Sequence, residues 1–265
     1  MFSLKNGDSQ RRFRWEKGVP HMHYILILLL LFGSDLHAES VSISSGTITA
    51  DDFLLDAVES GDAGAPGELV SRRYRLEPFT ALDVNSTFDA QFVINFIPDD
   101  AAKEYSLIDI HCAAGVADSL SMEVKGDSLF IEPDLPLYSK VDITVRSRSL
   151  ISIKSVGQNT ITIKDLNCDS FSAYLNGKTQ LELSGGAQAS YFDLVGPARL
   201  KAHDFHAGKV VIYAKDTSRA WVSPIQALKA VSYAAAEIYY LNEPAQMIKK
   251  VKAFGKIAYS PAFRP

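Results

Sequence analysis

The chain of 265 residues has the composition of a globular protein, with 47% hydrophobic and 22% charged residues, and is too apolar for a disordered chain. Its formal net charge of −4 and sequence pI of about 5.9 exclude the strongly basic surface that nucleic-acid binding requires. Its length is that of one large domain or two small ones. We therefore expect a folded protein with no nucleic-acid partner.

The only strongly apolar run, residues 24–32, predicts a signal peptide. A bilayer core needs about 20 apolar residues, so this run is too short to span one, but it has the length of a signal-peptide core. Basic residues precede it, and Ala38 ends a candidate cleavage site. We expect residues 1–38 to be removed on export, with Met22 as an alternative start, and the mature chain to lack a membrane span. No cysteine lies near the cleavage site to carry a lipid anchor.

The two cysteines, Cys112 and Cys168, leave two interpretations open. An even number is compatible with one disulfide in an oxidising compartment. Two unrelated buried thiols are the alternative. Their wide separation matches no zinc or redox spacing, so we expect neither metal nor cofactor at the cysteines.

Past the cleavage site, residues 39–68 are rich in Ser, Gly, Asp and Ala. This composition predicts a linker or a loosely attached segment. The domain proper then begins, at residue 69, and extends to residue 265. Its first half contains short β-branched and aromatic runs bounded by turn residues, which predict strands. These runs cover residues 82–84, 92–97, 106–112, 121–124, 129–131 and 141–145.

From residue 150 the sequence repeats about every 20 residues, and each repeat contains two expected strands. The first strands are aligned to begin at Ile151, Phe171, Tyr191, Val210, Ala230 and Val251. The second strands carry one apolar column at Ile161, Leu181, Leu200, Ala220, Ile238 and Ile257. A further column lies two residues on, at Ile163, Leu183, Ala202, Val222, Tyr240 and Tyr259. Both columns advance by 20, 19, 20, 18 and 19 residues.

Residues two apart in a strand share a face, so the two apolar columns predict one buried side of a sheet. A fixed period with strands is typical of stacked coils, in which each coil buries the apolar face of the next. We therefore predict an all-β fold, a right-handed parallel β-helix (β-solenoid) of roughly 20-residue coils, with Leu181, Leu183, Leu200 and Val222 in its core. The same repeat argues for strand in the alanine-rich residues 227–240. A β-sandwich is the alternative, since it also has closely spaced short strands.

Several stretches also resemble a known bacterial family. Residues 79–84 (FTALDV) and 128–131 (SLFI) are similar to its opening, and residues 216–222 (DTSRAWV), 236–240 (AEIYY), Pro244 and 255–257 (GKI) to its closing coils. The family is that of the putative auto-transporter adhesin, head GIN domain, a domain of unknown function. The resemblance covers about residues 69–260 and implies a right-handed parallel β-helix in an exported protein. It supplies no catalytic residues, and it departs at residues 233–236 (YAAA), where the family has glycines.

A carbohydrate-active enzyme on a β-helix scaffold is the alternative function, and it would require paired carboxylates on neighbouring coils. The best outward strand offers only Glu182 beside Lys201. His203 and His206 form the densest polar cluster, but no third ligand is spaced to join them, and we expect a solvated turn there. The sequence thus predicts no catalytic site and no metal site.

The outward column between the two buried ones is the candidate contact surface. It contains Lys201, Trp221 and Tyr239 on successive coils. An exposed aromatic column can stack on sugar rings or anchor a protein partner. The alternative is internal packing, in which a loop or residues 39–68 cover the column or its rings form a ladder. We predict an exported binding or structural module of the cell envelope, adhesive in character. The expected partners are an envelope protein, a glycan or a second copy, and the expected location is periplasmic, outer-membrane-associated or secreted.

Overall fold

The computed structural model describes residues 41–43, 46–48, 68–86, 90–102, 104–134 and 139–261. The chain divides between Asp52 and Phe53 into two compact units. The first unit contains an antiparallel pair of short strands, β1 (Val41–Ile43) and β2 (Gly46–Ile48). The signal peptide predicted for residues 1–38 lies outside the described residues. Of the segment predicted for residues 39–68, only these two strands and Glu68 are described.

The second unit is all-β, with one short helix, α2 (Ala114–Ala117), among its described residues. Its strands in the first half are β3 (Leu69–Leu76), β4 (Ala81–Asn85), β5 (Gln91–Pro98), β6 (Ser106–Ala113), β7 (Leu120–Lys125), β8 (Ser128–Pro133) and β9 (Lys140–Ser147). In the second half they are β10 (Ser152–Gly177), β11 (Gln180–Val195), β12 (Arg199–Ala214), β13 (Arg219–Ser232), β14 (Glu237–Tyr240), β15 (Gln246–Val251) and β16 (Lys256–Tyr259).

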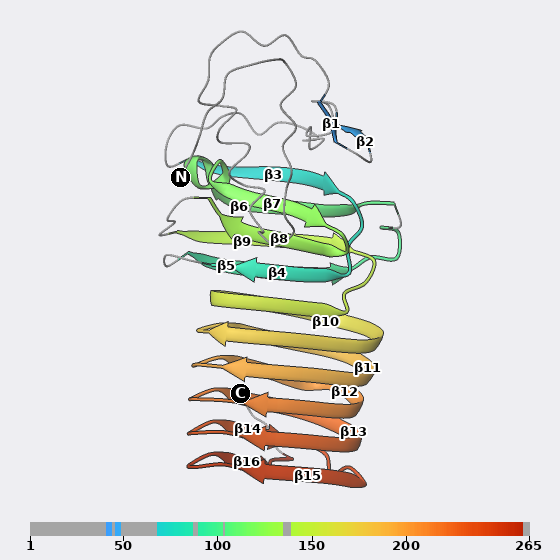
Figure 1. The fold of residues 1–265 in the computed structure, drawn as a ribbon, viewed down its shortest axis with the longest axis vertical. Coiled ribbons are helices and arrows are strands. Elements are labelled where there is room, and N and C mark those ends of the chain that lie inside the picture. Colours follow the sequence, from blue (N-terminus) through green and yellow to red (C-terminus); the bar gives the residue numbers. More distant parts are fainter. Residues whose placement is uncertain are drawn as a thin grey trace, which may run out of the picture. The chain divides into compact units, whose positions relative to one another are not determined.

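These strands form one open sheet of 14 strands, ordered β16-β14-β13-β12-β11-β10-β5-β9-β6-β3 along its main path. Figure 1 shows them stacked from β3 at one end to β15 and β16 at the other. The strand runs predicted between residues 82 and 145 fall within β4 to β9. Of the alanine-rich residues 227–240, those up to Ser232 and from Glu237 on are strand, as predicted, whereas residues 233–236 form a turn. The described strands of the second unit form one continuous sheet rather than the two packed sheets of the alternative β-sandwich.

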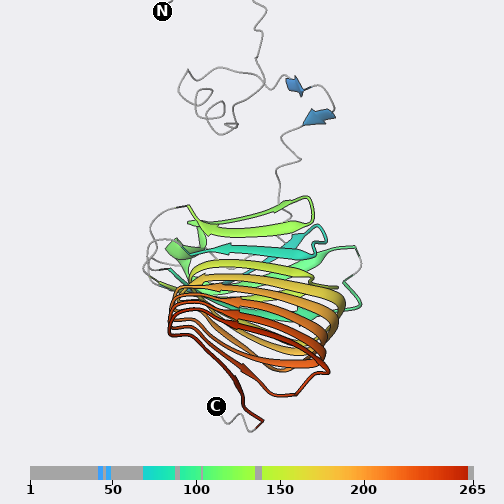
Figure 2. The ribbon, with the colours of Figure 1, turned by 60° about the horizontal axis from the view of Figure 1, so that its bottom comes forward.

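From β10 onward, neighbouring strands pair in parallel, one coil apart. Each of β10 to β13 runs through the corner that joins the two strands of a coil, and Figure 2 shows these coils bending round a common interior. The predicted register of the second strands is confirmed. Ile161 lies opposite Leu181, which lies opposite Leu200, and the column continues through Ala220, Ile238 and Ile257.

The register predicted for the first strands is wrong from the third coil on. Phe171 lies opposite Ser190, not Tyr191, and Ser190 lies opposite Val210. Val210 in turn pairs with Leu228, not with Ala230. The sequence alignment matched large residues to each other, whereas the fold buries Ser190 and exposes 45% of Tyr191. Because side chains alternate along a strand, this shift of one residue moves Tyr191 to the outward face.

The first half of the unit departs from the predicted run of sequential coils. Strands β4 and β5 pair in parallel with β10, and β8 and β9 pair in parallel with β4 and β5, so these layers are not in chain order. The pairs β7–β8, β6–β9 and β3–β6 are antiparallel. No repeat in residues 69–147 predicted this arrangement, because β3, β6 and β9 pair with strands that are not their neighbours in the chain.

The core is a single cluster of apolar side chains that follows the coils. Leu181, Leu183, Leu200 and Val222 are at most 1% exposed, so their predicted burial is confirmed. The same columns continue into the first half through Ile94 and Ile143, both fully buried. Stacking therefore buries an apolar face that no single coil could cover.

One turn in each coil uses a left-handed backbone conformation. Residues with positive φ occur at Gly157, Gly177, Gly196, Asp216, Ala234 and Ala253. Their spacing is 20, 19, 20, 18 and 19 residues, the same series as the apolar columns. The alanines at residues 233–236, where the sequence departs from the family, thus include one held in a conformation that glycine adopts without strain.

Candidate functional site

The candidate surface lies on the outward face of the second strands. Lys201 of β12 lies opposite Trp221 of β13, and Trp221 lies opposite Tyr239 of β14. The three side chains, called here the aromatic strip, are each partly exposed. The structure therefore brings together all three residues that the sequence grouped, because strands in parallel register place equivalent positions about 4.8 Å apart.

The two rings of the aromatic strip are stacked. Their centroids are 5.6 Å apart and their planes differ by 12°. Lys256 Nζ lies 5.1 Å from the centroid of the Tyr239 ring, and the Tyr239 hydroxyl donates a hydrogen bond of 3.3 Å to Glu237. The rings thus form the ladder that was one of the two expected arrangements, with polar groups fixing Tyr239 at one end.

Ion pairs flank the aromatic strip along the same face. Lys201 Nζ lies 3.9 Å from Glu182 Oε2, and Arg219 Nε lies 2.9 Å from Glu237 Oε2. Both acids therefore face a cation rather than another carboxylate. This arrangement provides charge and a flat aromatic surface for binding, and it lacks the pair of carboxylates that hydrolysis of a glycosidic bond requires.

The histidine cluster is not the solvated turn expected from the sequence. His203 and His206 lie within β12, beside a register shift, and Phe205 between them is 1% exposed. His203 Nε2 lies 3.2 Å from Asp204 Oδ2, whereas His206 Nδ1 lies 3.1 Å from Ser223 Oγ. Among the residues that the structure describes, no three metal-ligating side chains converge.

Both cysteines are free thiols, so the disulfide that their even number allowed is not formed in this structure. Cys112 is buried in β6, and Cys168 is half-buried in β10. Burial raises the pKa of each thiol, which lowers its reactivity because the thiolate is the nucleophile. These are packing residues of the kind that the second interpretation described.

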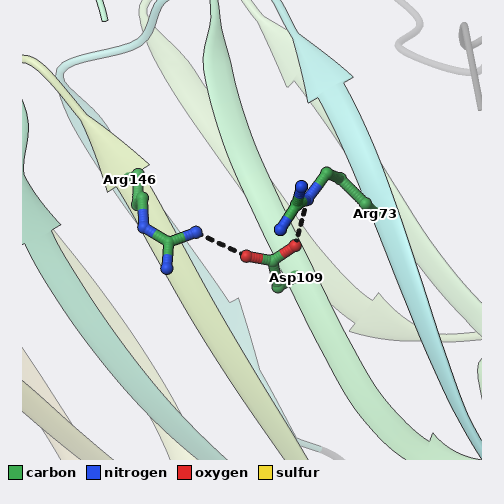
Figure 3. Close-up of polar contacts among 3 residues, drawn as sticks. All are labelled: Arg73, Asp109 and Arg146. Atoms are coloured by element: carbon green, nitrogen blue, oxygen red, sulfur yellow. Dashed lines mark hydrogen bonds and ion pairs between the residues drawn. The ribbon is translucent and has the colours of Figure 1, made fainter. Parts of the chain in front are cut away.

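A charged cluster on the first-half strands was missed by the sequence analysis. Figure 3 shows Arg73 and Arg146 on either side of Asp109, each from a different strand. Arg73 Nε and Arg146 Nη1 each lie 2.6 Å from an oxygen of Asp109. Burial tends to raise the pKa of this carboxyl, but the hydrogen bonds from Arg73 and Arg146 outweigh it, so the pKa lies below its ordinary value. The carboxylate therefore stays charged between two cations.

The charged cluster and the aromatic strip belong to one outward row of the sheet. Between them the row passes through Thr144 of β9, Asn95 of β5, Thr162 of β10 and Glu182 of β11. No sequence signal could have linked the cluster, because Arg73, Asp109 and Arg146 meet only through the antiparallel pairs β3–β6 and β6–β9.

A second outward surface contains the tyrosines displaced by the register correction. Tyr191 and Tyr213 have ring centroids 5.9 Å apart, inclined at 46°. An open hollow of about 380 Å³ beside them is lined by Tyr174, Tyr191 and Asp193, together with small side chains. Lys215 Nζ lies 2.9 Å from Asp193 Oδ1. The sequence alignment had placed Tyr191 in the column of Phe171, and this surface was not predicted.

The sequence matches the model of one known protein family. The family model described as "Putative auto-transporter adhesin, head GIN domain" matches residues 78–244. The chain belongs to this family. The match confirms the resemblance found in residues 79–84 and in the closing coils. A search of curated proteins finds no match.

The solved structures of similar fold are distant in sequence. A "putative adhesin" from Bacteroides fragilis is 18% identical, with a TM-score of 0.59, over 73% of this chain and 97% of that chain. A "putative adhesin" from Parabacteroides merdae is 14% identical, with a TM-score of 0.43, over 73% and 97% of the two chains. A "putative lipid binding protein" from Parabacteroides distasonis is 16% identical, with a TM-score of 0.40, over the same shares. At these identities the likeness concerns the fold alone.

Among the described residues, no helix is long and apolar enough to cross a membrane.

Proposed function

We propose that this protein is an exported binding module of the cell envelope, adhesive in character, with the aromatic strip as its contact surface. The short apolar run at residues 24–32 and the candidate cleavage site at Ala38 support export. Membership in a family described as an adhesin head domain supports a binding role. Periplasmic, outer-membrane-associated and secreted locations all fit this proposal.

We further infer that the second unit is a right-handed parallel β-helix. Parallel pairing in one register from β10 to β16 supports it, as does the positive-φ turn that recurs once in each coil. Such a scaffold holds successive outward side chains at fixed spacing on a flat face. A flat, rigid face binds an extended partner at little cost in ordering.

The observation that carries the binding role is the stacked pair of Trp221 and Tyr239. Both rings remain partly exposed on a regular sheet face, and Lys201 adds a cation at one end. Aromatic side chains dominate contact energies at binding surfaces because they bury a large apolar area at low entropic cost. A glycan that stacks on the rings, an envelope protein and a second copy are the three partner classes that this surface fits.

The test uses tryptophan fluorescence, because the chain contains only two tryptophans, Trp15 and Trp221. In the full chain carrying Trp15→Phe, emission comes from the aromatic strip alone. We expect polysaccharides or envelope fractions of the host cell that bind this protein to shift that emission. The variant Tyr239→Ala should weaken their binding by about tenfold, the loss typical of an aromatic contact.

The matched control is Phe254→Ala, which removes another aromatic ring, 93% exposed and located in the turn between β15 and β16. Binding by this variant should equal that of the parent chain. Binding without any emission shift would place the contact elsewhere. Loss of folding in Tyr239→Ala, seen as a lower unfolding midpoint, would assign the ladder to internal packing instead.

A further inference from the structure

The charged cluster carries more positive charge than its one shared acid offsets. Arg73 and Arg146 share Asp109, so the three groups have a formal charge of +1. Arg75, in the same outward row as Arg146, adds a third guanidinium, which lies 3.8 Å from the ring centroid of Tyr105. This local excess of cations stands in a chain whose overall charge is −4.

The geometry of the two arginines leaves room for a second acceptor. Each guanidinium reaches Asp109 through a single nitrogen, Nε of Arg73 and Nη1 of Arg146. A guanidinium has five N–H donors in a planar fork that matches the oxygens of a carboxylate, sulfate or phosphate group. Figure 3 shows the two forks extending toward the same carboxylate from the strands on either side of β6. The remaining donors can therefore serve an incoming oxyanion.

The surroundings of these arginines form a hollow with hydrogen-bonding walls. An open hollow of about 480 Å³ is lined by Arg72 and Arg73, by Asp109 and Asp142, and by Ser71, Ile110, His111 and Thr144. Arg146 lies beside this hollow, on the other side of Asp109 from Arg73. Ser71 Oγ and His111 Nδ1 lie 2.9 Å apart. Sites for small molecules enclose most of the ligand surface, whereas this hollow is open on a sheet face. Its shape suits a segment of a polymer, and its hydroxyl and imidazole groups suit sugar hydroxyls.

We propose that the hollow beside Asp109 binds an acidic polysaccharide, with Arg73 and Arg146 contacting a carboxylate, sulfate or phosphate group of the polymer. The hydroxyls of Ser71 and Thr144 contact the neighbouring sugar. The site is separate from the aromatic strip, so its test does not depend on the contact surface proposed above.

The experiment measures binding of the full chain to heparin, a sulfated glycan, and to polygalacturonate, a carboxylated one, with neutral dextran as the reference. We expect binding to an acidic polymer that weakens as salt rises, because salt screens exposed charges, and no binding to dextran. The double variant Arg73→Gln/Arg146→Gln should bind about tenfold more weakly or worse, since it loses charge-assisted hydrogen bonds.

The variant Asp109→Asn separates an anion site from an ordinary ion pair. It raises the local charge by one and frees both guanidinium groups, so we expect binding to tighten by about threefold or more. The matched control is Lys154→Gln, which removes one partner of another exposed pair, 2.8 Å from Asp83 Oδ2. Its affinity should stay within about twofold of the parent chain. Circular dichroism and unfolding midpoints check that each variant is folded.

Three outcomes would overturn the proposal. The first is that the folded double arginine variant binds as tightly as the parent chain. The second is that Asp109→Asn weakens binding. The third is that the parent chain binds vesicles containing phosphatidylglycerol but no acidic polysaccharide, which would assign the same oxyanion chemistry to a lipid headgroup. Binding by Trp221→Ala at parental affinity would show that this site works without the aromatic strip.

Discussion

The left-handed turn residues show how tightly single positions are constrained in this fold. A Cβ added at Gly177 would lie 2.8 Å from the carbonyl oxygen of Gly157 in the coil above. At Gly196, one coil further, the nearest atom would lie 3.5 Å away. Both glycines have positive φ, 86° and 73°. Both positions therefore require a left-handed backbone conformation, but only Gly196 has room for a Cβ atom.

We predict that Gly177→Ala destabilises the protein more than Gly196→Ala does. Each substitution places an alanine in the left-handed region, at a cost of roughly 1–2 kcal/mol. Only Gly177→Ala adds a clash with backbone, which should raise its cost to about 3 kcal/mol or more. Urea unfolding of the two variants measures the difference. Equal losses would mean that the neighbouring coils move apart freely at this turn.

At the scale of one strand, register decides which residues are buried. Tyr191 and Phe192 are adjacent in β11, yet Tyr191 is 45% exposed and Phe192 is 1% exposed. Phe192 packs against Phe171 of the previous coil, with ring centroids 6.3 Å apart and ring planes inclined at 56°. The sequence alignment had placed Tyr191 in the Phe171 column, which the structure corrects.

We expect Phe192→Ala to cost about 3–5 kcal/mol of unfolding free energy, because it leaves a cavity in the core. Tyr191→Ala should cost less than about 1.5 kcal/mol, since it removes a partly exposed contact with Tyr213. Chemical denaturation of the two variants compares neighbouring residues in the same strand. The opposite ranking would restore the register inferred from the sequence.

At the scale of the whole second unit, the last coil forms an open sheet edge, whose unpaired backbone groups could pair with another chain. Strand β15 pairs with β13 and β16 pairs with β14, and neither has a second partner among the described strands. Lys249 of β15 continues the buried column of Ala230, where earlier coils have apolar residues. Its Nζ donates a hydrogen bond of 3.1 Å to the Tyr240 hydroxyl. A charge in an inward column is one way in which natural sheets prevent edge-to-edge pairing.

We predict that Lys249→Leu promotes self-association of the protein. The substitution extends the apolar column to the open edge and removes the charge that opposes addition of another strand. Sedimentation velocity should reveal larger species that increase with concentration. The control is Lys250→Leu, because Lys250 lies opposite Val231 in a different column, the one that continues Asp193 and Tyr213. If both variants remain as monodisperse as the parent chain, Lys249 does not protect the edge.

The sequence by itself determined the β class, the coil length and the buried columns of the second strands. It could do so because equivalent positions of successive coils have the same environment. Leu181, Leu200 and Ile238 occupy one such position, and all three are apolar. It also determined the members of the aromatic strip, since residues in one register of a parallel stack become neighbours. Only the tertiary structure showed how the strands of the first half pair, because residues 69–147 contain no repeat. Antiparallel pairing of β3 with β6 and of β6 with β9 brought Arg73, Asp109 and Arg146 together. Other strands separate these three in the chain, and without a repeat no local pattern indicates which distant strands will pair.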